Sequence, residues 1–388
     1  MMRYDVCHNL RVSPLGGRRP SSPEAVSPPL AEIRIDAVGA VQRRALTPAL
    51  QEAGAQFRMH DATLFATLSG GCVAAVASRW QAGAGTHQLG VELAAAWQPL
   101  PGVISLAGAT LEYRRRALVM GIINTTPDSF YPPSRRCVAA AAEAAARMAE
   151  QGADLVDLGG ESTRPGAAPV PAAEEIRRVV PAVEAIVAAG GPPVSIDTAK
   201  AEVAAAALDA GAAMVNDVSG LRDLRLRRLV AERDVPAVVM HMRGSPRTMQ
   251  QGIHYEDTVG EVLGELKRRL NDALAAGVRH RQLIVDPGIG FGKRVGDNLR
   301  LLQGLPALRA LGPVLVGVSR KSFLGKLLGA ALEDRLDATT AANTIALLRG
   351  ADILRVHDVA AAAQATRLVA ALEAPAGEEP AAGGAAGG

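Results

Sequence analysis

The hydrophobic residues of this chain fall into short continuous runs that recur along its last two thirds. Eight runs rich in Val, Ile and Leu lie at 118–123, 155–159, 194–197, 214–217, 237–241, 283–286, 314–319 and 353–357. Continuous apolar runs are typical of parallel strands buried on both faces. Segments with helical periodicity separate the runs, and glycines stand where these helices should end, at Gly152, Gly190, Gly211 and Gly277.

Strand and helix alternate eight times between residues 113 and 373, which predicts a (β/α)8 TIM barrel over this range. A doubly wound open sheet is the alternative fold. It would require some strands to be reassigned, and no GxGxxG fingerprint follows the first run.

The segment before the barrel has a different pattern. Residues 31–112 predict a small α+β extension, with strands near 31–38, 56–60 and 63–70 and helices near 41–54 and 91–97. Its polar residues His60, Asp61 and His87 are interpreted as surface groups. Residues 1–30 and 374–388 are rich in Pro, Gly, Ser and Ala, and we expect both to be disordered.

Composition narrows the class of protein. The chain has 388 residues, 48% of them hydrophobic, which is enough for one large domain and one small one. A net charge of +3 and 3% aromatic residues give no case for a nucleic-acid or membrane partner. Cys7, Cys72 and Cys137 lie far apart, and the N-terminus has no apolar leader, so we expect reduced thiols in a cytoplasmic protein.

Polar residues follow nearly every apolar run, at the strand ends where a TIM barrel forms its active site. A single Asp there, such as Asp217 or Asp334, is as readily explained as the N-cap of the next helix. The set also contains amides and cations, which capping does not require, so it predicts a polar ligand site. Its members are Asn124, Glu161, Asp197, Asn216, Asp217, His241, Asp286, Ser319, Arg320, Lys321, Arg355 and His357.

Two groups of these residues indicate what the ligand contains. Arg355 and His357 lie two apart on the last strand and therefore face the same side, which predicts a phosphate or diphosphate close to them and to Asn124. Asp197, Asn216 and Asp286 supply acceptors and an amide that suit the edge of a flat heterocycle, although they could also satisfy buried backbone groups.

The segment DPGIGFGK (286–293) offers a glycine-rich loop that could bind phosphate through backbone amides. It lacks the GK[ST] ending of a nucleoside triphosphatase loop. The chain also contains no HExxH or GxSxG motif.

Taken together, eight blocks along residues 113–373 resemble the dihydropteroate synthase family, in that family's order. They are NTTPDSF (124–130), GGESTRPG (159–166), SIDT (195–198), NDVSG (216–220), HMRGSPRTMQ (241–250), DPGIGFGK (286–293), SRKSFLG (319–325) and RVHDV (355–359). Residues 31–112 resemble an N-terminal extension found in some bacterial members.

The resemblance implies the following pterin contacts. Asp286 and Asn216 would bind the amino-pyrimidine edge and Asp197 the other ring. Lys321 would bond the pterin oxo group and a ring nitrogen, and Arg355 would pack on the ring face. Asp197, Asp286, Lys321 and Arg355 are therefore the expected catalytic residues.

The resemblance also implies a second set of contacts. Asn124, Arg355 and His357 would bind the diphosphate, with Thr163 and Arg164 closing over it, and Mg²⁺ would bridge Asn124 and the diphosphate oxygens. The p-aminobenzoate pocket and its lid, where sulfonamides would compete, would be formed by Asp128, Phe130, Thr163, Pro165, Arg320, Lys321 and Ser322. Tyr131-Pro132-Pro133-Ser134 departs from the family's usual first loop and predicts a stiffer lid.

The implied reaction joins 6-hydroxymethyl-7,8-dihydropterin diphosphate to p-aminobenzoate, giving 7,8-dihydropteroate and diphosphate by an SN1-like path. The same family resemblance implies a homodimer. Two alternatives remain: a pterin-dependent methyltransferase, which would not need the SRKS, RVH or NTTPDSF blocks, and a non-catalytic pterin-binding paralogue, which only the altered lid favours.

Overall fold

In the computed structural model, the described residues are 10–15, 30–35, 40–60, 63–83, 89, 102–113, 115–125, 135–162 and 167–373. Of the sequence predictions, Asp61, His87, the helix near 91–97 and the tail at 374–388 lie outside them.

Eight parallel strands form the centre of the molecule, in the order β12-β11-β10-β9-β8-β7-β14-β13. A bridge between Val285 and Val314 joins the two ends of this order, so the sheet closes. The predicted TIM barrel is confirmed, and the open doubly wound sheet is wrong. The strands are β7 (Leu118–Asn124), β8 (Leu155–Gly159), β9 (Val194–Asp197), β10 (Met214–Asp217), β11 (Ala237–Met240), β12 (Leu283–Asp286), β13 (Leu315–Val316) and β14 (Ile353–Val356).

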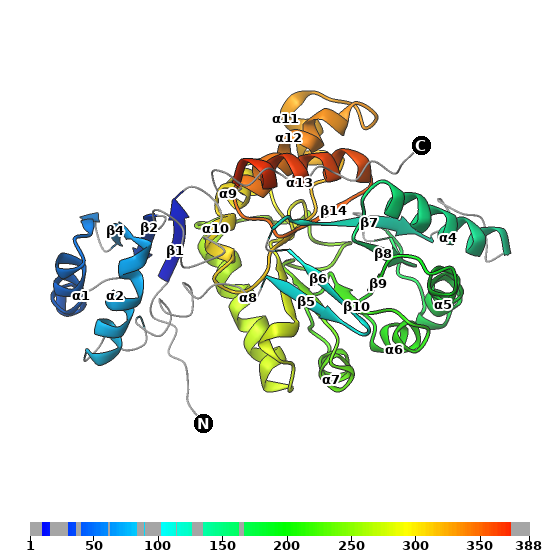
Figure 1. Cartoon of the computed structure of the whole chain (residues 1–388), viewed down its shortest axis with the longest axis horizontal. Coiled ribbons are helices and arrows are strands. Elements are labelled where there is room, and N and C mark those ends of the chain that lie inside the picture. The colour runs from blue at the N-terminus through cyan, green and yellow to red at the C-terminus, as the bar shows by residue number, and fades with distance from the viewer. Residues whose placement is uncertain are drawn as a thin grey trace.

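Helices surround the strands, as Figure 1 shows. The main core lies between the two layers, where outward-facing strand residues such as Val119, Val156 and Ile196 meet the apolar faces of the helices. The helices are α4 (Arg135–Glu150), α5 (Ala172–Ala188), α6 (Ala201–Asp209), α7 (Leu224–Arg233), α8 (Thr258–Ala275), η1 (His280–Gln282), α9 (Val295–Gln303), α10 (Leu305–Leu308), α11 (Ser322–Leu328), α12 (Arg335–Leu348) and α13 (Val359–Glu373).

A hairpin closes the N-terminal end of the barrel. Its strands β5 (Val103–Leu106) and β6 (Ala109–Glu112) pair antiparallel and lie across the barrel strands in Figure 1, in cyan. Ile104 and Leu106 pack against the first inward-facing residues of the barrel strands, including Leu118, Met214 and Ile353. The hairpin therefore shares its core with the barrel.

Two carboxylates stabilise the same end of the barrel in the same way. Asp154, just before β8, accepts from Arg116 at 2.6 Å and from the Val119 backbone N–H at 2.7 Å. Asp352, just before β14, accepts from Arg309 at 2.9 Å and from the Val314 N–H at 2.9 Å. Each one binds an arginine and the backbone of a neighbouring chain segment.

Among the described residues, the N-terminal unit contains a four-stranded antiparallel sheet, in the order β1-β2-β4-β3, and the helices α1 and α2. Its core includes the buried Trp80, whose indole N–H donates to the Leu46 carbonyl at 3.2 Å, and Ala310 of the barrel packs against this core. The elements are β1 (Leu10–Leu15), β2 (Leu30–Ile35), α1 (Ala40–Glu52), β3 (Gln56–His60), β4 (Thr63–Ser69) and α2 (Gly70–Ala82).

Strand β1 lies within the segment 1–30 that was expected to be disordered. Residues 10–15 pair with β2 along their whole length, from Leu10 opposite Ile35 to Leu15 opposite Leu30. These backbone hydrogen bonds depend on a partner that lies 20 residues further along the chain, which local composition does not reveal. In the described part of the chain, no helix is both long and apolar enough to cross a membrane.

Candidate active site

The C-terminal ends of the barrel strands bring the predicted pterin residues together. Asp197 and Asp286 are the last residues of β9 and β12, Asn216 is the last but one of β10, and Arg355 comes from β14. Lys321 precedes α11, beyond β13. All these strands are parallel, so their carboxyl ends meet at one mouth.

Arg355 is the centre of this group. Its Nε donates to Asp157 Oδ2 at 2.6 Å, and its Nη2 donates to Asp197 Oδ2 at 2.7 Å. Asp157 Oδ2 also accepts from the Asn216 amide at 2.8 Å. The network thus fixes the planes of the guanidinium and of the Asn216 amide before any ligand arrives.

Asp157 was not among the predicted site residues. It lies in the middle of β8, is fully buried, and links two residues that were predicted. The signal that could have revealed it is a charged residue inside the otherwise apolar run LVDLG, since a buried carboxylate requires partners.

Two oxygens in this network are left for a ligand. Within the described residues, no donor reaches the buried Oδ1 atoms of Asp157 and Asp197. Burial raises the pKa of Asp197 to about 7, although the Arg355 guanidinium acts in the opposite direction. A buried acceptor without a partner is costly, so it marks a position where a donor is expected to bind.

Asp286 is held by the tight turn that follows β12. Its Oδ1 accepts from the Gly288 N–H at 2.6 Å, and burial raises its pKa. Gly288 has a φ of +64°, and a Cβ there would overlap the His241 carbonyl oxygen. Only glycine therefore fits this turn, which explains its place in the DPGIGFGK segment.

Lys321 lies against the same loop. Its Nζ donates to the Ile289 carbonyl and lies 4.7 Å from the centre of the Phe291 ring. Burial lowers the pKa of Lys321 to about 8, and the nearby Asp286 carboxylate opposes this shift. The ammonium is thus placed between a carboxylate and an aromatic face at the mouth.

Two predicted site residues in the segment after β13 bind different partners. Ser319 Oγ lies 3.1 Å from His357 Nδ1 and also accepts from the His357 backbone N–H, so it orients the imidazole. Arg320, which was predicted to frame p-aminobenzoate, has a φ of +53° and a two-point ion pair with Asp358 at 2.8 and 2.9 Å.

His241 and Asp217 are buried near the barrel mouth and bind other protein groups. His241 is fully buried between Glu265 Oε2 at 3.1 Å and Lys293 Nζ at 3.0 Å, and burial lowers its pKa to about 4. Asp217 accepts from Ser219 and from the Leu221 N–H in the turn after β10. Asp334 stands at the N-cap of α12 without a side-chain capping bond.

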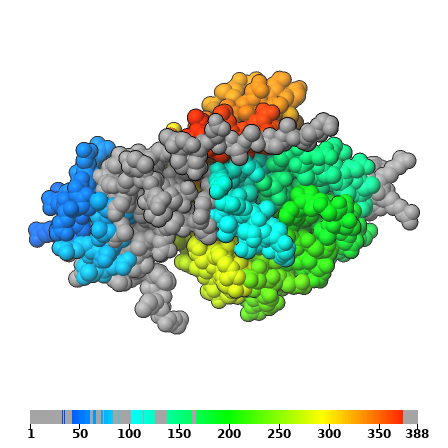
Figure 2. Space-filling model, viewed as in Figure 1, coloured from blue at the N-terminus to red at the C-terminus, as the bar shows by residue number. Residues whose placement is uncertain are grey.

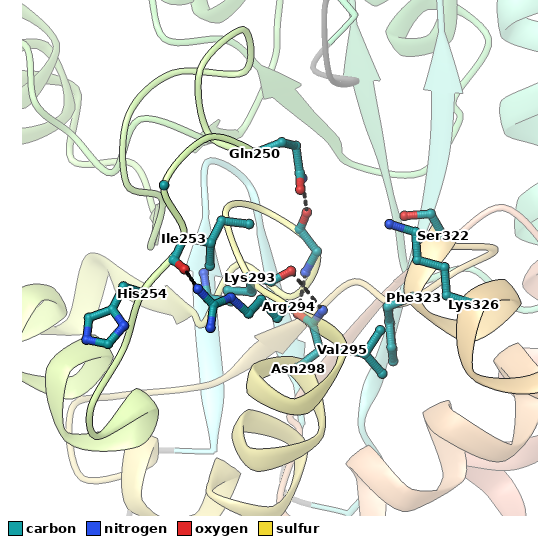
Figure 3. A pocket seen from close by; sticks show the side chains of 12 residues that line it. Gln250, Ile253, His254, Lys293, Arg294, Val295, Asn298, Ser322, Phe323 and Lys326 are labelled. Atoms are coloured by element: carbon teal, nitrogen blue, oxygen red, sulfur yellow. Dashed lines mark hydrogen bonds between the residues drawn. The ribbon is translucent and has the colours of Figure 1, made fainter.

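A cavity of about 680 Å³ adjoins the mouth. Figure 3 shows Ser322, Phe323 and Lys326 of α11 on one side and Ile253 and His254 on the other. The remaining lining residues are Gln250, Gly252, Gly290, Lys293, Arg294, Val295 and Asn298. Gly290 also touches the Lys321 site, since a Cβ on it would lie 2.9 Å from Lys321 Cδ.

The predicted lid lies outside the described residues. This concerns Asp128, Phe130, Thr163, Arg164 and Pro165, together with residues 131–134. Glu161, which begins the second loop, is described and pairs with Lys200, which also binds Glu175.

The candidate metal site predicted from the sequence lies at Asn124. No group of three His, Cys, Asp or Glu side chains among the described residues could hold an ion. Asn124 ends β7 at the mouth and is half-buried, next to Gly159 of β8. A single amide oxygen suits Mg²⁺, which keeps several waters and usually shares its shell with substrate phosphates.

Comparison with known proteins agrees with this arrangement. The family described as "Pterin binding enzyme" matches residues 120–357. Dihydropteroate synthase of Synechocystis sp. is 44% identical over 279 residues, which cover 71% of this chain and 95% of that protein. A probable bifunctional folylpolyglutamate synthase/dihydropteroate synthase of Haloferax volcanii is 50% identical over 243 residues, 62% of this chain, and this chain spans only 29% of that longer protein.

Solved structures give the same result. Xanthomonas albilineans dihydropteroate synthase with 4-aminobenzoic acid has a TM-score of 0.65 and 46% identity, covering 71% of this chain and 99% of that one. Yersinia pestis dihydropteroate synthase with a sulfonamide drug has a TM-score of 0.66 and 39% identity, covering 70% and 98%. The chain therefore belongs to the pterin-binding enzymes and, within them, to the dihydropteroate synthases, as its sequence motifs predicted.

Proposed function

We propose that this chain is a transferase of folate biosynthesis that condenses 6-hydroxymethyl-7,8-dihydropterin diphosphate with p-aminobenzoate to give 7,8-dihydropteroate and diphosphate. The observation that carries the proposal is the convergence of Asp197, Asn216, Asp286, Lys321 and Arg355 at the barrel mouth, in a chain of this family.

The pterin binds edge-on between these side chains. Asp286 and Asn216 bind the amino-pyrimidine edge, and Asp197 Oδ1, which has no partner among the described residues, accepts from the other ring. Lys321 donates to the oxo group and a ring nitrogen. Arg355 covers the ring face, and Asp157 and Asp197 hold its guanidinium in place.

The diphosphate lies at the other side of Arg355, within reach of His357 and Asn124. Ser319 contacts His357 Nδ1 and so orients the imidazole ring. In this orientation His357 Nε2 can donate to the leaving diphosphate. Asn124 would hold Mg²⁺ together with the diphosphate oxygens. When bound, this ion would neutralise the charge that develops on the diphosphate.

The reaction breaks the C–O bond to the diphosphate and forms a C–N bond to a neutral arylamine, which needs no base to become a nucleophile. The nitrogen then gives up one proton to the released diphosphate or to water. The difficult step is charge separation. Asp197 and Asp286 stabilise a pterin-methyl cation, and Arg355 and His357 stabilise the departing anion, which favours a dissociative, SN1-like path. Residues Asp128, Phe130, Thr163, Arg164 and Pro165 form the lid in this proposal, exclude water and hold the amine in line.

The arylamine enters through the cavity beside α11, where Ser322 lies next to Lys321 at the edge of the pterin site. Sulfonamides compete with it there. Arg320 contributes by fixing the turn before Lys321 through its pair with Asp358.

The enzyme is a homodimer in this proposal and works in the cytoplasm, which suits three widely spaced cysteines. Most of the exposed large apolar side chains among the described residues belong to the adjacent helices α11–α13 and to the loop between α11 and α12; the orange segment, which includes α11, projects from the body in Figure 2. They are Leu327, Leu328, Leu332, Leu336, Ile345, Leu348, Leu368 and Leu372. In this proposal these side chains form the interface between the two subunits.

Sedimentation velocity tests the dimer. The wild type should sediment as a dimer and the variant Leu368→Glu/Leu372→Glu as a monomer. The variant Leu224→Glu is a matched control, because Leu224 is an exposed apolar residue elsewhere on the surface. A monomeric wild type at micromolar concentration would contradict the proposed dimer.

A diphosphate-release assay tests the reaction. The purified protein receives the pterin diphosphate and Mg²⁺, with and without p-aminobenzoate, and dihydropteroate is detected directly. Product that forms only with both substrates and is lost in Lys321→Ala would support the synthase. Pterin diphosphate binding without product would instead favour a non-catalytic paralogue.

A further inference from the structure

The lysine that ends the DPGIGFGK segment does not form part of a phosphate loop. Lys293 is 4% exposed, and its Nζ lies 3.0 Å from His241 Nδ1, 3.3 Å from the His241 carbonyl oxygen and 3.0 Å from the Phe291 carbonyl oxygen. It belongs to the loop between β12 and α9 and is labelled beside Arg294 in Figure 3. An ammonium buried in this way is costly unless it is paired.

Its partner His241 is fixed by a further residue. Burial lowers the pKa of His241 to about 4, so the imidazole is neutral. Its Nε2–H can then donate to Glu265 Oε2 at 3.1 Å, while Nδ1 accepts from Lys293. Arg243 holds the other oxygen of Glu265 at 2.6 Å, which ties the chain of contacts to helix α8.

The ammonium lies directly behind the turn that carries Asp286. A Cβ built on Gly288 would be 3.4 Å from Lys293 Nζ, and the N–H of the same Gly288 donates to Asp286 Oδ1 at 2.6 Å. Lys293 therefore acts on the Asp286 carboxylate across the turn at Gly288.

Electrostatics agree with this geometry. Burial raises the pKa of Asp286, and Lys321, Lys293 and Arg355 all oppose that shift. Lys321 and Arg355 belong to the proposed pterin contacts, whereas Lys293 Nζ contacts His241 and the Phe291 carbonyl oxygen.

We propose that Lys293 is a positioning residue of the pterin site, which keeps the Asp286 carboxylate ionised and its turn in place through the buried chain Lys293–His241–Glu265. This inference rests on the proposed function, because it takes Asp286 as the acceptor of the pterin amino-pyrimidine edge. An ionised carboxylate offers acceptors only, which is what two neighbouring N–H donors require.

The pH dependence has a definite sign. The titratable groups that face Lys293 are Asp286 of β12, Lys321 before α11, His241 after β11, and Glu265 and Arg269 of α8. Burial lowers the pKa of Lys293 to about 7, so it is charged mainly below that pH. Loss of the lysine should therefore weaken pterin binding at low pH, where Asp286 would become protonated, and hardly at all at high pH.

The test is calorimetric binding of 6-hydroxymethylpterin, which lacks the diphosphate, between pH 6 and pH 9. The Kd of Lys293→Met should exceed that of the wild type by about tenfold at pH 6 and approach the wild-type Kd at pH 9. A purely structural role would instead raise the Kd by the same factor at every pH, and that result would overturn the proposal.

Lys267→Met is the matched control, because it removes an exposed lysine from the same helix that carries Glu265; its Kd should follow the wild type throughout. If Lys293→Met does not fold, Glu265→Gln replaces it, with a smaller shift in the same direction expected and no shift overturning the proposal. Dihydropteroate synthesis by the wild type is measured in parallel. A wild type that makes no product would contradict the proposed function, whereas a pH-independent Kd ratio with an active wild type would contradict only the role of Lys293.

Discussion

At the N-terminal end of the barrel, Asp154 and Asp352 use both carboxylate oxygens on arginine and backbone donors, whereas at the C-terminal end Asp157 and Asp197 each keep one buried oxygen for which the described residues offer no donor. Both ends bury charge against arginine. The difference lies in the carboxylate oxygens. Donors reach all of those of Asp154 and Asp352, which suits a stabilising role, whereas the unpartnered oxygens of Asp157 and Asp197 indicate where a ligand binds. Among the described residues, the buried atom without a partner in the N-terminal pairs is a donor, Arg309 Nη1.

The largest effect is expected at the C-terminal end, from Arg355→Met. Loss of the guanidinium removes a contact to both the pterin and the leaving diphosphate, and leaves Asp157 and Asp197 without their shared partner. We expect kcat/KM for dihydropteroate formation to fall by about 10³-fold. A variant within tenfold of the wild type would show that Arg355 is not part of the catalytic site.

The corresponding change at the other end is Asp352→Ala. It leaves Arg309, whose side chain is 10% exposed, without its carboxylate. The free energy of unfolding should drop by about 3–5 kcal/mol, as for other buried pairs that lose one partner, while kcat/KM stays unchanged. Urea unfolding and the activity assay measure the two quantities. A further change of Arg309 to Met should recover part of the loss, and a large effect on kcat/KM would end the comparison between the two ends.

The pH profile sharpens the comparison. Burial raises the pKa of Asp197 to about 7, and its ionised form is the one that stabilises the pterin cation. The value of kcat/KM should therefore rise with pH and level off above about pH 7. At about pH 6, one unit below this pKa, it should be about tenfold below the plateau. Asp197→Asn should lower the plateau and remove this limb. If the limb persists in the variant, another group is responsible for it.

The smallest effect is expected from Arg116→Ala, at the N-terminal end. This pair with Asp154 is partly open to solvent, with side chains 33% and 18% exposed. Such pairs contribute about 1 kcal/mol or less, and kcat/KM should not change. Thermal unfolding measures the loss, and a cost as large as that of Asp352→Ala would mean that burial does not distinguish the two pairs.

Much of the fold could be predicted because barrel strands buried on both faces form continuous apolar runs. The predicted runs 155–159, 194–197, 214–217 and 283–286 coincide with β8, β9, β10 and β12. The run 314–319 was too long, because Val314 forms a single bridge, Leu315 and Val316 form β13, and Arg320 then adopts a left-handed turn.

For the site, the sequence could predict which residues lie at the strand ends but not what their side chains contact. The sequence places Asp197, Asn216 and Asp286 at one rim, but it does not show which way a side chain at a strand end points. His241 follows its strand like the others, yet it is buried against Glu265, which comes from a helix 24 residues further along. Asp157 and Lys293 were missed for the same reason, since their partners are distant in sequence.

The hairpin β5–β6 has a practical consequence for anyone who would isolate the catalytic barrel. The sequence pattern alone would suggest cutting at residue 113, but Ile104 and Leu106 cover Leu118, Met214 and Ile353 from below. A fragment that starts there would expose this apolar floor to water and should aggregate. A fragment that starts at Gly102 keeps the hairpin that covers these apolar residues. The catalytic unit therefore begins about ten residues before the strand–helix repeat that the sequence shows.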